Sequence, residues 1–285
     1  MTVQPVLSSV AVWTPAGVWT NTGPTKRNGG ADLKPWNEAP LLSAIHPRAR
    51  RPHPLAVALI QLAHALLTAR EAATDAPSFN RQEVDLLLGT LTGSTAADFE
   101  FWSGIQSRGA AFGSPSTFVY TLPSAALAEI ALALGVRGSV ATLTAGTISG
   151  IASVARSASR ISTGRGRACI CGGVEFARVD NHRASGLFEQ DAIALFLVEA
   201  RSASMRWPVL RDWQSGFAPD QGQPSPRVAD MSPLSTLSTL ASVAVRLGAS
   251  LGVEEVFGSS FDGHWARITL ASWQNFDRQP ETHSP

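Results

Sequence analysis

The sequence offers few side chains that could act as nucleophiles, and the thiols among them have no evident partner. The two cysteines, Cys169 and Cys171, stand two residues apart, and a disulfide at that spacing within one strand would be strained. Buried cysteine usually packs as a small apolar side chain, so we expect neither thiol to react. The six histidines are scattered, without the spacing to a carboxylate or thiol that a metal site needs. We therefore expect no metal and no cofactor.

Two hydroxyl side chains occupy the place where an acyl-transfer enzyme would put its nucleophile. Thr147 and Ser149 follow a turn between an expected strand and an expected helix. Such a turn points side chains into a cleft beside a helix N-terminus, which stabilises negative charge. A serine or threonine also needs a base and a third group that orients the base. No histidine can be assigned to that role, so we interpret both residues as part of the first helical turn.

The elements around this turn form a strand, helix and strand unit over residues 139–175. Residues 139–144 are β-branched and apolar, and Gly146 interrupts them where the chain must turn. Apolar residues then recur at helical spacing over residues 148–161. A Gly-Arg-Gly link ends that helix, and residues 167–171 form a second short buried strand closed by two glycines.

The rest of the chain alternates between strands and helices, which indicates an α/β layered fold. Further strands are expected over residues 6–14, 84–92, 117–121, 191–200, 205–217, 256–261 and 265–272, and helices over residues 55–72, 94–106, 123–134 and 234–251. Loops are expected over residues 15–40 and 218–228, and a disordered tail over residues 274–285.

Composition narrows the class of protein. A chain of 285 residues is long enough for a full core, and a net charge of +1 argues against nucleic acid as the main partner. We find no signal peptide and no run of eighteen apolar residues, so a cytoplasmic protein without membrane association is expected. Three carboxylates near a helix start, Asp85, Asp98 and Glu100, are expected to be solvated.

The unit over residues 139–175 resembles the active-site region of the β-ketoacyl synthases, in the thiolase superfamily. In that family an apolar strand leads into Thr-Ala-Cys, and a small-residue helix leads to a strand ending Gly-Gly-Val-Glu. The chain matches this pattern at Thr144-Ala145 and at Gly172-Gly173-Val174-Glu175. Further matches follow the family's order at Leu122-Pro123-Ser124, Gly135-Val136-Arg137-Gly138-Ser139 and Ala194-Leu195-Phe196-Leu197-Val198-Glu199.

The resemblance implies a thiolase-like fold with layers α-β-α-β-α and a shortened C-terminal half. The expected divisions are a ketosynthase-like half over residues 1–200, a truncated second half over residues 201–273 and the tail over residues 274–285.

The chain departs from the family where the chemistry would occur. The position of the catalytic cysteine is Gly146, and glycine cannot form an acyl-enzyme. The family's two catalytic histidines, one in a His-Gly-Thr motif and one in a late Gly-His motif, have no counterparts. The resemblance therefore implies no catalytic residue, with Thr144, Ala145 and Thr147 as the neighbours of a vestigial nucleophile position.

Inactive copies of ketosynthases are known as chain-length factors, which pair with an active ketosynthase in type II polyketide assembly, including the aryl polyene type. The resemblance implies that a ketosynthase α subunit joins at the strand of residues 139–145, and that an acidic acyl carrier protein binds nearby. The implied dimer contacts are Val140, Thr142 and Thr144, the implied tunnel residues are Asp98, Phe101, Trp102 and Phe118, and the implied carrier contacts are Arg48, Arg50 and Arg51.

Two other functions stay open from the sequence. The same fold could carry an acyltransferase or thioesterase that uses Thr147, Ser149 or a cysteine as its nucleophile. The chain could also be a scaffold or regulatory protein that forms a homodimer. Covalent labelling would distinguish the first of these from a chain-length factor, and the oligomeric state would distinguish the second.

Overall fold

The computed structural model describes residues 3–14, 17–22, 53–73, 77, 80–175, 192–202, 205, 207–217, 253–259, 264–272 and 274. Its strands are β1 (Pro5–Thr14), β2 (Gly17–Thr22), β3 (Val84–Gly89), β4 (Val140–Leu143), β5 (Ala168–Glu175), β6 (Ala192–Ala200), β7 (Val209–Phe217), β8 (Val253–Ser259) and β9 (His264–Ala271). Its helices are α2 (Pro54–Glu71), α3 (Thr95–Arg108), α4 (Pro115–Val119), α5 (Ala125–Leu134) and α6 (Ser149–Ser162), with short 3-10 turns η1 (Arg81–Glu83) and η2 (Ala110–Phe112).

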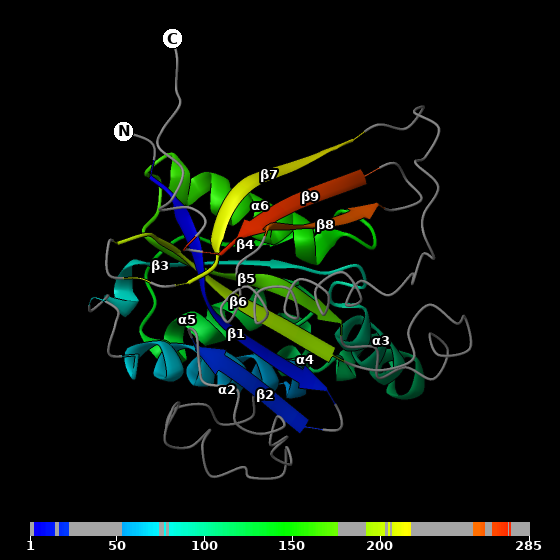
Figure 1. Ribbon diagram of the computed structural model, residues 1–285. Coiled ribbons are helices and arrows are strands. Elements are labelled where there is room, and N and C mark those ends of the chain that lie inside the picture. The colour runs from blue at the N-terminus through cyan, green and yellow to red at the C-terminus, as the bar shows by residue number, and fades with distance from the viewer. Residues whose placement is uncertain are drawn as a thin grey trace.

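The strands form one sheet that contains an internal repeat (Figure 1). The strand order is β4-β3-β5-β6-β1-β7-β9-β8, and β2 pairs with β1. β3 runs parallel to β4 and β5, whereas β6 runs antiparallel to β5 and β1. The antiparallel order β5-β6-β1 is repeated as β8-β9-β7, and the two units meet where Val6 pairs with Val209. Within the described ranges, the second unit has no counterpart of β3 and β4.

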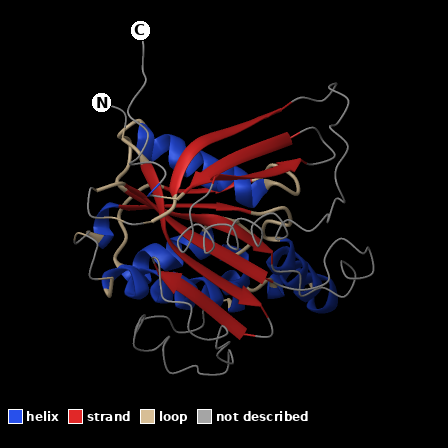
Figure 2. Ribbon diagram, in the orientation of Figure 1, coloured by secondary structure: helices blue, strands red, loops and turns tan. Residues whose placement is uncertain are grey.

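Helix α6 lies between the two units. Its buried side chains, such as Ile151 and Val154, share one core with Phe196 of β6 and with Leu210 and Ile268 of β7 and β9. The opposite face of the first unit is covered by α2 and α5, which form a second core with β3, β5 and β6. Figure 2 shows these helices on opposite sides of the central strands. Successive side chains of a strand point to opposite faces of the sheet, so β5 and β6 contribute to both cores. Because α6 packs against strands of both units, it forms a central layer.

A buried ion pair fixes α2 to the sheet through the motif at residues 194–199. Arg70 Nε lies 2.7 Å from Glu199 Oε2, and its Nη2 lies 3.1 Å from Oε1. The same guanidinium stands 4.9 Å from the ring centroid of Trp207, which is itself fully buried. Two charged groups and an aromatic face therefore satisfy one another in the interior, and the motif's glutamate has a structural partner.

The structure corrects three predicted elements. Residues 117–121 are not extended but overlap α4, because Ser114 accepts the N–H of Thr117 and Pro115 occupies the first helical turn. β2 occupies part of the range predicted as a loop. β5 does not close at its glycines but continues to Glu175, since Gly172 and Gly173 pair with β6. The predicted helix at 234–251, the loop at 218–228 and the tail after residue 274 lie outside the described residues.

Most of the other predicted elements are confirmed. The helix expected at 148–161 is α6, the one at 55–72 is α2, and the one at 123–134 is α5, which ends at Gly135 in a left-handed conformation. The predicted boundary at residue 200 falls between β6 and β7 and stays a prediction. Across the described ranges, no helix is long and apolar enough to cross a membrane.

Candidate functional site

The turn between β4 and α6, called here the elbow (residues 144–148), is built for glycine and closed by a serine. Gly146 has φ +58°, a conformation that glycine adopts freely and that a side chain would strain. The Ser149 hydroxyl accepts the N–H of Ala145 at 2.8 Å and donates to the Gly146 carbonyl at 2.6 Å. Ser149 is fully buried. Both hydrogen bonds of its hydroxyl therefore stabilise the elbow, which fits the interpretation of this residue as part of the first helical turn.

Glycines let α6 approach the sheet closely at the elbow. A Cβ on Gly89, at the end of β3, would lie less than 3.0 Å from the Ser149 carbonyl. One turn further along α6, the Ser153 hydroxyl lies 2.7 Å from the Gly172 carbonyl and accepts the Gly172 N–H at 2.8 Å. Gly172 has φ +134° and lies against the β6 backbone. The glycines of β3 and β5 thus fix where the helix begins.

Ser153→Ala is expected to lower the free energy of unfolding by about 2 kcal/mol. The substitution leaves the Gly172 N–H buried without its acceptor, and an unsatisfied buried group costs roughly 1–3 kcal/mol. Denaturant unfolding followed by circular dichroism measures the change. Ser107→Ala is the matched control, because the exposed Ser107 hydroxyl bonds only the carbonyls of its own helix. Equal stability of the two variants would contradict the assigned role of Ser153.

The two thiols are buried in the core between β5 and α6. Both cysteines are free, and Cys169 Sγ lies 3.1 Å from the Ser157 hydroxyl. Burial, with a smaller effect from Cys169, raises the pKa of the Cys171 thiol well above its ordinary value. A thiol that stays protonated and out of contact with solvent is a poor nucleophile.

No imidazole stands near the elbow among the histidines whose side chains the structure describes. His53 caps α2 and His64 lies within it, on the opposite face of the sheet from α6. Within the described part of the chain, no group of three or more His, Cys, Asp or Glu side chains could hold a metal ion.

An activated acyl-thioester probe is therefore expected to leave Ser149, Cys169 and Cys171 unlabelled in the folded chain. The two thiols and the hydroxyl are buried, and the hydroxyl is engaged by backbone groups on both sides. Intact-protein mass spectrometry checks this prediction, with the denatured chain as the control in which the thiols become reactive. A stoichiometric adduct on the folded chain would support an acyltransferase or thioesterase instead.

The prediction that Asp85 is solvated is wrong. The Asp85 side chain of β3 is buried and contacts the start of β4 and the end of α6. It accepts the N–H of Ser139 at 2.7 Å and pairs with Arg160 Nη2 at 2.8 Å and Nε at 3.1 Å. Asp98 and Glu100 are exposed on α3. Asp85 thereby fixes the start of β4 and the C-terminal end of α6. The prediction grouped Asp85 of β3 with two acids of α3, and it missed Arg160 because that partner is distant in sequence.

Strand β4 forms one edge of the sheet. It pairs with β3, and no other described strand pairs with it. Val140 is 39% exposed, Thr144 is exposed and Thr142 is half-buried. An edge strand with an exposed apolar side chain and unpaired backbone groups can receive another chain.

A second surface is formed by α3, η2 and α4, called here the aromatic arm (residues 95–122). Six of the ten large hydrophobic side chains that are exposed in the described ranges lie on it, namely Phe99, Trp102, Phe112, Phe118, Val119 and Leu122. The Phe101 and Phe118 rings contact each other at 5.3 Å between centroids, and Asp98 Oδ2 lies 3.0 Å from the Ser94 hydroxyl oxygen. So dense a cluster is typical of a protein contact surface.

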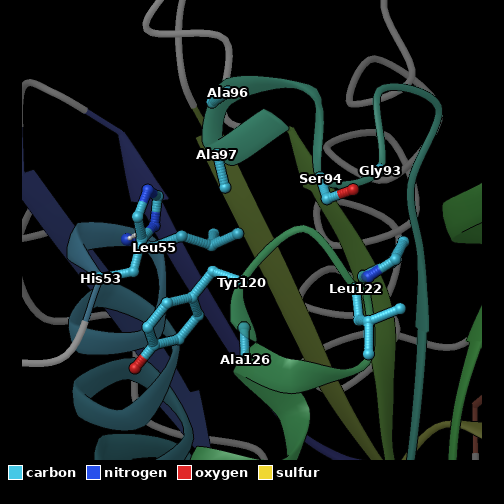
Figure 3. A pocket seen from close by; sticks show the side chains of 10 residues that line it. His53, Leu55, Gly93, Ser94, Ala96, Ala97, Tyr120, Leu122 and Ala126 are labelled. Atoms are coloured by element: carbon cyan, nitrogen blue, oxygen red, sulfur yellow. Dashed lines mark hydrogen bonds between the residues drawn. The ribbon is translucent and has the colours of Figure 1, made fainter. Parts of the chain in front are cut away.

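A small pocket opens beside the aromatic arm (Figure 3). It is lined by His53, Leu55, Gly93, Ser94, Ala96, Ala97, Tyr120, Leu122, Pro123 and Ala126. None of the four implied tunnel residues lines this pocket; Asp98, Trp102 and Phe118 are instead exposed, and Phe101 is half-buried. No motif in the sequence pointed to this pocket. Arg48, Arg50 and Arg51, which the resemblance implied as carrier contacts, lie outside the described residues.

Comparison with known proteins identifies the fold and the family. The chain shares its fold with AntDE:AntF, a type II PKS acyl-carrier protein in complex with its ketosynthase bound to the hexaketide, at TM-score 0.70 and 14% identity, covering 95% of this chain and 100% of that chain. The ishigamide ketosynthase/chain length factor matches at TM-score 0.67 and 13% identity, over 94% and 99% of the two chains. An oxazolomycin ketosynthase domain from Streptomyces albus matches at TM-score 0.61 and 11% identity, over 95% of each chain.

No curated protein matches the chain. The family model for the β-ketoacyl synthase N-terminal domain matches residues 15–188, which is more than half of the sequence. This match includes the elbow, the aromatic arm and the β4 edge. Together with the layered fold, it shows that the chain belongs to the β-ketoacyl synthase family.

Proposed function

We propose that this protein is a non-catalytic subunit of a type II polyketide ketosynthase, acting as a chain-length factor. The observation that carries the proposal is the elbow: the family's scaffold is kept around it, while the nucleophile position is Gly146 at φ +58°. A glycine offers no atom that could accept an acyl group. The likeness to a solved ketosynthase/chain length factor supports the same function.

The partner is an active ketosynthase α subunit that joins along the β4 edge. Val140, Thr142 and Thr144 are the proposed contacts, and the unpaired backbone groups of β4 would pair with the partner's strand. The aromatic arm extends this interface, because its exposed Trp102 and Phe118 are residue types that concentrate binding energy when they become buried. The heterodimer would therefore bury surfaces that the single chain leaves in water.

The product-length function rests on the same arm. Asp98, Phe101, Trp102 and Phe118 are proposed to close the end of a tunnel that holds the growing chain. Because most of this set faces solvent in the single chain, the tunnel wall would be complete only after the ketosynthase has bound. Bulkier side chains at these positions would then shorten the product, since they reduce the volume left for the chain.

The acyl carrier protein is proposed as a further partner, with the arginines at 48, 50 and 51 attracting its acidic surface. One solved relative by fold contains an acyl-carrier protein in complex with its ketosynthase. The proposed complex acts in the cytoplasm and uses no cofactor of its own.

Light scattering of the purified chain, alone and after mixing with a type II ketosynthase that retains Cys and both His, tests the partner assignment. The proposal predicts a stable complex with one copy of each subunit. If the chain forms a homodimer and binds no such ketosynthase, the result would instead support the scaffold function. The gene next to the one for this chain is the first source of a candidate ketosynthase.

A further inference from the structure

The glutamate that ends the Gly-Gly-Val-Glu motif is buried at the base of the aromatic arm. Glu175 is 1% exposed. Its Oε1 accepts the Leu91 N–H at 2.6 Å, and its Oε2 accepts the Thr92 hydroxyl at 2.7 Å and the Thr92 N–H at 3.2 Å. All three donors belong to the loop that connects β3 to α3. One carboxyl group of β5 therefore holds the segment from which the arm begins.

The same loop is connected onward to the arm. The Ser94 hydroxyl donates to the Thr121 carbonyl at 2.6 Å, beyond the end of α4. The loop's Thr90 hydroxyl accepts the Gly93 N–H at 2.9 Å, which keeps the turn tight. Hydrogen bonds to Glu175 therefore hold the loop, and the Ser94 hydroxyl in the same loop holds the far end of the arm.

No described cation compensates the Glu175 charge. The groups that face the carboxyl are the hydroxyls of Thr90 and Thr92 and the two loop amides. The other charged side chains of the elements packed here point elsewhere or lie at the far ends of those elements. Asp85 of β3 and Glu199 of β6 lie at the opposite end of the sheet, and Arg156 and Arg160 lie in the later turns of α6. Asp98 of α3 is exposed, and its carboxylate lies beside Ser94.

Burial raises the pKa of Glu175 to about 7, although the loop's hydrogen bonds act in the opposite direction. The neutral acid fits this site well. Its carbonyl oxygen can keep the Leu91 N–H, while its hydroxyl can donate to the Thr92 hydroxyl, which rotates to accept. The ionised form is instead a buried charge surrounded by neutral dipoles, and it gains hydration if the loop opens.

We propose that Glu175 is the positioning residue that holds the aromatic arm against the sheet, and that this hold weakens when its carboxyl ionises. The direction follows from linkage. The closed state binds the proton more tightly than an open state in which the carboxyl is hydrated, so raising the pH from about 4.5 to about 7 favours opening. The equilibrium constant for opening would rise on the order of a hundredfold over this range and level off above it.

Hydrogen exchange of the isolated chain, followed by mass spectrometry over residues 90–98 and corrected for intrinsic rates, tests this hold directly. In the unmodified chain, the opening constant should rise up to about pH 7 and then level off. Glu175→Gln should remove the pH dependence and should leave the loop more protected than the unmodified chain at pH 8. Glu83→Gln, an exposed glutamate whose partner Arg167 lies 3.4 Å away, should follow the unmodified chain.

A flat pH profile in the unmodified chain, or an unchanged rise in Glu175→Gln, would overturn the proposal. The pH dependence of the opening constant in the unmodified chain tests the proposal even if the variant does not fold. Whether the position of the aromatic arm matters for binding a ketosynthase rests on the proposed function. If no ketosynthase binds, that function fails, whereas the exchange measurement still decides the role of Glu175 because it uses the chain alone.

Discussion

Replacing Trp102 and Phe118 together by aspartate is expected to weaken binding of the proposed ketosynthase partner by more than about a hundredfold. Both side chains are more than half exposed in the single chain, at 57% and 58%. Large aromatic residues that become buried at an interface commonly contribute 2 kcal/mol or more each, and an uncompensated carboxylate in their place adds a desolvation cost. Titration calorimetry with the purified ketosynthase measures the change.

The control for this prediction is Leu132→Asp, on α5. Leu132 is the most exposed large hydrophobic side chain described, at 73%, but it lies on the helix layer that covers the opposite face of the sheet from α6. Its variant should bind normally, and both variants should unfold within about 1 kcal/mol of the unmodified chain. Normal binding by the double variant would exclude the aromatic arm from the interface.

Gly89→Ala is expected to lower the free energy of unfolding by about 3 kcal/mol or more. The added Cβ would lie less than 3.0 Å from the backbone carbonyl of Ser149, and neither β3 nor α6 can retreat without opening the core between them. The elbow would shift as well, because Ser149 closes it. Denaturant unfolding measures the loss.

Gly104→Ala is the matched control for this effect. Gly104 lies inside α3, and the nearest atom to an added Cβ is the flexible Arg108 guanidinium at 3.1 Å. Alanine in a helix interior is favoured over glycine by roughly 0.5–1 kcal/mol, so this variant should be as stable as the unmodified chain or slightly more stable. If both glycine variants behaved alike, the close approach of α6 to β3 would not be what fixes the elbow.

Local patterns in the sequence sufficed for most of the fold around the elbow. The helical spacing over residues 148–161 and the apolar run before it correspond to α6 and β4, since both signals depend on neighbours in the chain. The helix at α4 was missed, although Ser114-Pro115 is a recognisable helix start. Strand β5 was cut short because its glycines resemble a strand end, whereas pairing with β6 carries the strand through them.

The contacts of the site could be predicted less well, because they join residues that are distant in sequence. The residues around Asp85 in the sequence do not predict its ion pair with Arg160. The residues around Glu175 do not predict its hydrogen bonds with the amides of Leu91 and Thr92. The exposure of the aromatic side chains could not be predicted either. Aromatic residues at helical spacing fit a core as well as a contact surface, and only the structure places Trp102 and Phe118 in solvent.

The central claim is that this chain has no reaction of its own and sets the product length of a partner enzyme. Its most direct test is a condensation assay with malonyl and acyl carrier-protein substrates, in which mass spectrometry reads the length of the products. We predict no condensation by the chain alone, and a length distribution for the ketosynthase that changes when the chain is added. Condensation by the chain alone, or identical products with and without it, would contradict the claim.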